Sequence, residues 1–243
     1  MRKLIKNINV NYELYGEGND TIVLLHGWGQ NIEMMKPIGD NLRREHQILI
    51  IDLPGFGLSD EPDFPWTLYD YVEMLKEMIE SLKLKNIILM GHSFGGKISL
   101  LYASMYPVKK IVVFGSPYKC KVAKDNLKTR TLKKLKKIPG LNKLEEFAKK
   151  HIGSTDYKNA SPMMREVLVN HVNLDITEEV KKIKSPLLII WGTNDAAVPI
   201  ADAYELEKLV PGSGLVVYPN CTHYAYLENL GQTINVLRSV LGG

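Results

Sequence analysis

Cysteine is scarce in this chain, which has two among its 243 residues, Cys120 and Cys221. They lie about a hundred residues apart, so they form neither the disulfide framework of a small secreted domain nor the close spacing of a metal-binding motif. We therefore expect two ordinary thiols and no metal site.

Long apolar runs are missing as well. Charged residues interrupt the first six residues, MRKLIK, before an apolar stretch reaches the length of a signal peptide. No run approaches the roughly 18 apolar residues of a membrane-spanning helix. These features predict a cytoplasmic protein with neither a membrane nor nucleic acid among its partners.

The composition is that of a folded domain, with 45% hydrophobic and 24% charged residues, and it excludes a disordered or fibrous protein. The net charge of +4 is unevenly distributed: residues 118–184 hold seventeen Lys and Arg against eight Asp and Glu. Two interpretations stay open, a set of solvated helix faces and a surface that recruits an anionic partner.

Short apolar runs rich in Val, Ile and Leu alternate with helix-length segments. Continuous apolar runs are typical of strands that are buried on both faces, and alternation with helices indicates a mostly parallel sheet. Residues 3–15 read as two further strands that turn near Asn7. The fold class is therefore α/β, with about eight strands and helices on both faces. The six apolar runs are residues 21–25, 47–51, 86–90, 110–114, 186–191 and 215–218.

Outside residues 118–184, three segments have a helical pattern. Residues 67–82 place their apolar side chains on one face behind a Thr67 cap, and residues 97–105 and 227–241 are also predicted to be helical.

One gap interrupts the alternation. About seventy residues separate the strands at 110–114 and 186–191, which is too long for a structureless loop in a compact domain. This gap predicts an inserted helical cap, residues 118–184, on a core made of residues 1–117 and 185–243. Its expected helices are residues 121–137, 141–152 and 162–173.

The run Gly91-His92-Ser93-Phe94-Gly95 follows a predicted strand and precedes a predicted helix. Small residues two positions either side of a serine let strand and helix pass closely while the hydroxyl stays exposed on a tight turn. The turn also places the serine at a helix N-terminus, where backbone donors favour an oxyanion. Ser93 is therefore the candidate nucleophile.

Two nucleotide-binding motifs match only in part. A phosphate-binding loop needs Ser or Thr after Lys97 to hold magnesium, but Ile98 stands there. A dinucleotide fingerprint that begins at Gly27 and Gly29 would need its third glycine at Ile32. Both readings fail, and we expect no cofactor.

A serine nucleophile needs a base and an acid, in the chain order serine, acid, histidine. Of the six histidines, only His223 lies beyond the last predicted strand, in a polar loop. The strand at residues 186–191 runs into Gly192-Thr193-Asn194-Asp195, which places Asp195 after the end of that strand, where it can also serve as a turn former. The other position used for an acid, residues 115–117, offers Gly, Ser and Pro. The predicted set is therefore Ser93, Asp195 and His223.

A tetrahedral oxyanion needs two backbone donors aimed at one point. The Phe94 amide, directly after the serine, is one candidate, and the Trp28 amide in the loop after the first buried strand is the other. Gly27 and Gly29 let this loop approach Ser93, and His26 is expected to support the loop through hydrogen bonds.

Five motifs occur along the chain in a characteristic order. They are His26-Gly27-Trp28-Gly29, the turn from Asp52 to Asp60, Gly91-His92-Ser93-Phe94-Gly95-Gly96, Gly192-Thr193-Asn194-Asp195, and His223 with Glu228 behind it. With these motifs the chain resembles the α/β-hydrolase superfamily over everything except the cap. Among its members, the chain looks most like carboxylesterases of the pimeloyl-carrier-protein methyl ester esterase type, and it is similar to C–C hydrolases of meta-cleavage products.

This resemblance implies hydrolysis of a small-molecule carboxylic ester through an acyl-enzyme. The alternatives are C–C hydrolysis, acyl transfer or lyase chemistry on the same residues, and ligand binding without turnover. The resemblance also implies that the basic cap receives an acidic carrier protein or an anionic thioester. Related dehalogenases use Asp as nucleophile, so Ser93 argues against that activity.

Overall fold

An eight-stranded sheet forms the centre of the computed structural model, which describes residues 1–120 and 155–242. The strand order is β1-β2-β4-β3-β5-β6-β7-β8. The β1–β2 and β2–β4 pairs are antiparallel and the other pairs are parallel, which confirms the predicted mostly parallel sheet. The strands are β1 (Arg2–Ile5), β2 (Ile8–Gly16), β3 (Thr21–Leu25), β4 (Gln47–Ile51), β5 (Ile87–His92), β6 (Lys110–Phe114), β7 (Leu187–Gly192) and β8 (Gly214–Tyr218).

Helices connect most of the strands. The expected helix at residues 162–173 is confirmed as α7, whereas the expected helices at residues 121–137 and 141–152 lie outside the described residues. The described helices are η1 (Ile32–Met34), α1 (Lys36–Leu42), α2 (Leu68–Ser81), α3 (Phe94–Met105), α6 (Thr155–Asn159), α7 (Pro162–Asn173), α8 (Thr177–Val180), α9 (Ile200–Leu209), α10 (Ala225–Glu228) and α11 (Leu230–Leu241).

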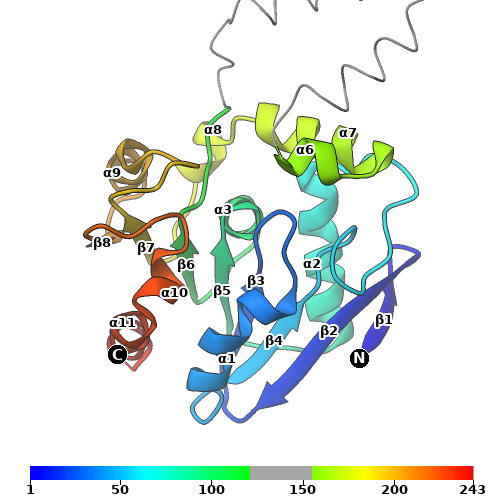
Figure 1. Cartoon of the computed structure of the whole chain (residues 1–243). Coiled ribbons are helices and arrows are strands. Elements are labelled where there is room, and N and C mark those ends of the chain that lie inside the picture. Colours follow the sequence, from blue (N-terminus) through cyan, green and yellow to red (C-terminus); the bar gives the residue numbers. More distant parts are fainter. Residues whose placement is uncertain (121–154, 243) are drawn as a thin grey trace, which may run out of the picture.

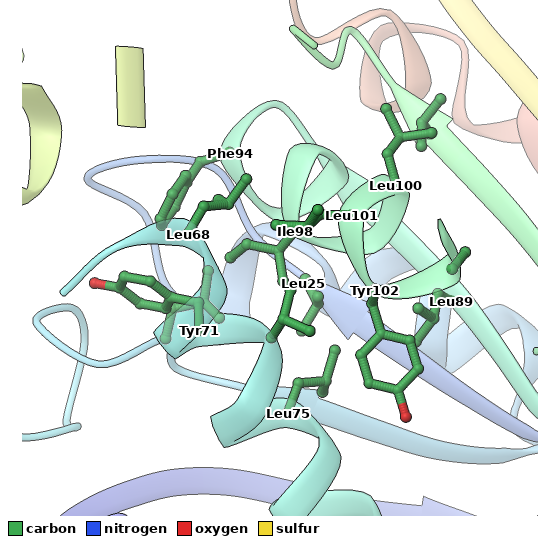
Figure 2. Close-up of a cluster of buried hydrophobic side chains, with 14 of the residues drawn as sticks. Leu25, Leu68, Tyr71, Leu75, Leu89, Phe94, Ile98, Leu100, Leu101 and Tyr102 are labelled. Carbon is green, nitrogen blue, oxygen red and sulfur yellow. The ribbon is translucent and has the colours of Figure 1, made fainter. Parts of the chain in front are cut away.

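The core has two layers because successive strand residues point to opposite faces. Val23 and Leu25 of β3 pack in the cluster that holds α2 and α3, whereas Ile22 and Leu24 pack with α1 and α11 (Figure 1). Figure 2 shows part of the first layer, with Leu25 beside side chains of α2 and α3. Each such buried side chain contributes about 1.5–3 kcal/mol.

The start of α2 follows from its sequence. Thr67 accepts a hydrogen bond from the Asp70 amide, and the Asp70 carboxylate accepts one from the Thr67 amide at 2.9 Å, which is a capping box. The apolar stripe of α2 then packs against α3, as the predicted amphipathic pattern requires.

Three predicted details are wrong. The helix after the serine begins at Phe94, three residues before its apolar pattern, because the elbow turns directly into α3. The expected helix at residues 227–241 is divided at Asn229 into α10 and α11. The strand β8 is only partly buried, because it is the edge of the sheet and has a neighbour on one side.

The loops after β3, β5, β7 and β8 meet at the carboxyl ends of the parallel strands. Figure 1 shows α6 and α7 beyond these ends, above α3. In the described ranges no helix combines the length and the apolar character that crossing a bilayer requires.

Candidate active site

Ser93 occupies a strained turn between β5 and α3. Its φ of 51° and ψ of −111° lie where few non-glycine residues are found. Its amide donates to the Phe114 carbonyl at 2.9 Å, which ties the turn to β6. A Cβ atom at Gly91 would lie 2.4 Å from the Gly95 backbone, and one at Gly95 would lie 2.4 Å from the Leu25 carbonyl. Larger residues at either glycine would displace the turn.

Asp195 lies in the loop after β7 and His223 in the loop after β8, and the two side chains are in contact. The Nδ1 atom of His223 is 2.7 Å from Oδ2 of Asp195, whose side chain is inaccessible to solvent. The other oxygen, Oδ1, accepts hydrogen bonds from the Ala197 and Val198 amides, each at 2.8 Å. The carboxylate is thus fixed from three directions.

This pairing sets the tautomer of His223. Because Asp195 Oδ2 accepts, Nδ1 carries the proton and Nε2 is left with a lone pair. The neighbouring strand end makes room for the pair, since a Cβ atom at Gly115 would lie 3.0 Å from Nδ1 of His223 and 3.1 Å from Oδ2 of Asp195. Residues 115–117, which contain no acidic side chain, therefore contribute the space that the His223–Asp195 pair occupies.

Ser93 and His223 line one cavity of about 450 Å³. Ser93 and His223 share the cavity, and Asp195 is joined to it through its hydrogen bond to His223. Among the described residues, no hydrogen bond joins the Ser93 hydroxyl to the imidazole. Such contacts often shorten when substrate binds.

Of the two residues predicted to supply oxyanion donors, Phe94 directly follows Ser93 and Trp28 lines the same cavity. Phe94 is the first residue of α3, so its amide has no partner within the helix. Neither its amide nor that of Trp28 donates to another group in the described part of the chain. The rings of the two residues are in edge contact, with centroids 5.4 Å apart.

His26 joins the loop after β3 to the loop after β4. Its Nδ1–H group donates to the Gly27 carbonyl at 2.7 Å, and its Nε2 atom accepts from the Leu53 amide at 3.0 Å. Complete burial lowers the pKa of His26 to about 4, so the ring is neutral near pH 7. Gly29 has a φ of +71°, a conformation that favours glycine.

Two residues that the sequence analysis did not assign to the site also line the cavity, Lys97 and His171. The Lys97 side chain is fully buried, and its Nζ donates to the His171 and Leu174 carbonyls at 2.9 and 2.6 Å, at the C-terminal end of α7. Burial lowers the pKa of this lysine to about 8. A lone lysine among the apolar residues of a helix was the signal that could have identified it.

His171 falls within residues 118–184, the segment that the sequence predicts to be a cap. Its ring stacks on Trp28 with centroids 6.3 Å apart and meets Phe94 edge-on at 4.4 Å. It therefore packs against both residues whose amides are the candidate oxyanion donors.

In residues 1–120 and 155–242, no three His, Cys, Asp or Glu side chains form a group that could hold a metal ion. Cys120 and Cys221 are both free thiols.

A family model described as "alpha/beta hydrolase fold" matches residues 20–133 and 121–230. The chain is 24% identical to a pimeloyl-[acyl-carrier protein] methyl ester esterase of Aliivibrio fischeri, over 95% of this chain and 96% of that protein. It is 25% identical to a 2-hydroxy-6-oxononadienedioate/2-hydroxy-6-oxononatrienedioate hydrolase of Escherichia coli, over 92% of this chain and 88% of that protein. A solved esterase of Exiguobacterium antarcticum has the same fold, with a TM-score of 0.80 and 22% identity over 100% of this chain and 99% of its own.

Proposed function

Because this chain belongs to the α/β-hydrolase family, we propose that it cleaves carboxylic esters through an acyl-enzyme on Ser93. The observation that carries the proposal is the His223–Asp195 hydrogen bond of 2.7 Å beside the cavity that also holds Ser93. A histidine that is protonated at Nδ1 and bears a lone pair at Nε2 is the form that a general base requires.

The first half of the reaction acylates Ser93. His223 Nε2 takes the proton of the hydroxyl while the oxygen attacks the ester carbonyl, which forms a tetrahedral oxyanion. Collapse of this intermediate breaks the bond to the alcohol oxygen, and the imidazolium returns the proton to that oxygen. Asp195 stabilises the imidazolium throughout, without taking its proton.

The second half repeats these steps with water. His223 removes a proton from a water molecule, the hydroxide attacks the acyl-enzyme, and the acid leaves as Ser93 recovers its proton. In both halves the Trp28 and Phe94 amides hold the oxyanion, and each donor is worth roughly 3 kcal/mol.

A second candidate function is C–C bond hydrolysis at the same residues. It is supported by the likeness to the E. coli hydrolase, which matches over a similar length and at similar identity to the esterase. A dienoate whose two oxo groups stand in a 1,5 relation through a conjugated chain separates the two functions. A C–C hydrolase cleaves a carbon–carbon bond of this compound and releases a carboxylic acid, whereas an esterase leaves the compound intact. Acyl transfer and lyase chemistry remain further alternatives on this scaffold.

The division into core and cap is also a proposal. We propose that residues 118–184 form the cap, and the proposal is supported by α7, which lines the cavity through Leu168 and His171. The positive charge of this segment fits an acidic carrier protein or an anionic thioester as the group that presents the ester.

The direct experiment is hydrolysis of short p-nitrophenyl esters by wild type and by Ser93→Ala. We expect nitrophenol release by the wild type and a loss of at least about 10³-fold in the variant. The matched control is Ser104→Ala, since the Ser104 hydroxyl donates to the Leu101 carbonyl within α3, away from the cavity. Equal rates for wild type and Ser93→Ala would remove the serine mechanism.

A further inference from the structure

His92, the residue before the candidate nucleophile, is almost wholly buried, with 1% of its surface exposed. It ends β5, so its position relative to Ser93 is fixed by the sheet. Its two ring nitrogens face two different loops. Nε2 lies 3.0 Å from the His223 carbonyl, and Nδ1 lies 3.2 Å from Oε1 of Gln30.

Gln30 extends this contact to the loop that holds the Trp28 amide. Its Oε1 accepts from the Gly27 amide at 3.0 Å, and its Nε2 donates to the Tyr224 hydroxyl at 3.2 Å. His92 and Gln30 thus connect three loops: the one after β3, the serine turn after β5, and the histidine loop after β8.

The packing around His92 leaves little freedom. Its ring contacts those of His223, Tyr224 and Tyr226, with centroids 4.7, 5.2 and 5.1 Å away. A Cβ atom at Gly27 would lie 2.8 Å from Nδ1 of His92, so this glycine is required for the loop to reach the ring.

We propose that His92 is a positioning residue, which holds the His223 loop and the Trp28 loop in place around Ser93 through its two ring nitrogens. The inference rests on the proposed function. It assigns His92 no contact with the reacting atoms, because its partners are a backbone carbonyl and a side-chain amide.

The protonation state follows from the partners. Burial lowers the pKa of His92 to about 3, so the ring is neutral and donates from one nitrogen. The His223 carbonyl can only accept, so Nε2 carries the proton. Nδ1 then has a lone pair and can only accept, so it hydrogen-bonds to Gln30 only after a half-turn of the amide that brings the N–H group round in place of Oε1.

Two substitutions separate a positioning role from space filling. In His92→Phe the aromatic volume is kept and both polar contacts are lost, and we expect kcat for a p-nitrophenyl ester to fall about tenfold or more with KM within about twofold. In His92→Gln a side-chain N–H can again reach the His223 carbonyl, and we expect kcat within about threefold of wild type. The control is His46→Phe, a buried histidine next to β4 and away from the cavity, which should leave both constants unchanged.

A third substitution covers the case in which His92→Phe does not fold. Gln30→Met removes the polar link at the partly buried partner, and we expect it to lower kcat severalfold without changing KM. In a folded double variant, the losses from Gln30→Met and His92→Phe should be less than multiplicative, because both break one network.

Wild-type kcat in His92→Phe or in Gln30→Met would overturn the proposal, as would equal losses in His92→Gln and His92→Phe. If these variants keep wild-type rates while Ser93→Ala is inactive, the positioning role fails and the proposed function stands. If Ser93→Ala keeps activity, the proposed function itself fails.

Discussion

At the scale of single residues, the side chain of Asp195 shows how position defines chemistry. One oxygen is occupied by the Ala197 and Val198 amides, so the other is the one that faces His223. The backbone of the same loop therefore decides which nitrogen of the imidazole is protonated.

Asp195→Asn should invert that tautomer. The two amides retain the Asn oxygen, the Asn amide N–H group turns to Nδ1 of His223, and the proton moves to Nε2, where a lone pair is needed. We expect kcat to fall about 10³–10⁴-fold with little change in thermal stability, measured with p-nitrophenyl esters. The control is Asp20→Asn, a partner of Lys109. Near-normal turnover in Asp195→Asn would mean that Asp195 does not orient the base.

The buried His26 predicts that the folded protein loses stability in acid. His26 has a pKa of about 4 in the folded protein against an ordinary value of 6.5. Below pH 6.5 the unfolded chain binds a proton at this residue and the folded chain does not, so stability falls as pH falls towards 4. The loss amounts to roughly 3 kcal/mol for this group. The free energy of unfolding, measured in urea for wild type and His26→Asn at pH 7, 5.5 and 4, should depend less steeply on pH in the variant. The same pH dependence in both proteins would refute the assignment.

At the scale of elements, Lys97 connects two helices. Its ammonium group on α3 donates to two carbonyls at the end of α7, where positive charge is favoured. The same helix supplies the Leu168 and His171 side chains to the cavity wall. We therefore expect Lys97 to fix the position of this cavity wall relative to Ser93.

Lys97→Met should displace that wall. We expect kcat/KM for long acyl esters to fall about tenfold, because the chain loses contact with α7, and kcat/KM for acetyl esters to change less than about threefold. Lys76→Met on α2 is the control for loss of charge. Equal effects on long and short acyl esters would show that Lys97 does not control the cavity wall that α7 supplies.

The elements differ in how far sequence predicts them. The continuous apolar runs of β3, β4 and β6 have their expected bounds, and each of these strands has a neighbour on each side and is buried on both faces. The start of α3 was missed because glycines carry no apolar pattern, and the exposure of β8 depends on its place in the sheet. The roles of His92 and Lys97 depend on partners 131 and 74 residues away, which spacing cannot reveal.

At the scale of the whole molecule, the charge is divided between two parts of the chain. Residues 118–184 carry an excess of nine positive charges, and the remainder carries an excess of five negative charges. Attraction between exposed charges is screened within about 10 Å at 0.1 M salt and about 3 Å at 1 M. A partner bound by this segment would therefore be held electrostatically and released by salt.

Ser93→Ala, which leaves the ester intact, is the form in which to measure that binding. We expect it to bind an acyl-loaded acidic carrier protein at low ionic strength and to release it at 1 M salt, as followed by surface plasmon resonance. The control is a protein of the same size as the carrier protein whose surface carries no net charge. If binding does not respond to salt, or if no binding is found, the lysines are best explained as solvent-exposed helix faces without a partner.

The loops that meet at the sheet are proposed to activate one serine, Ser93, out of all those in the chain. Labelling with a fluorophosphonate, followed by intact mass and peptide mapping, tests this activation. We predict one adduct per chain, on the peptide that contains Ser93, and none in Ser93→Ala. An adduct on another serine, or equal labelling of the variant, would contradict the claim.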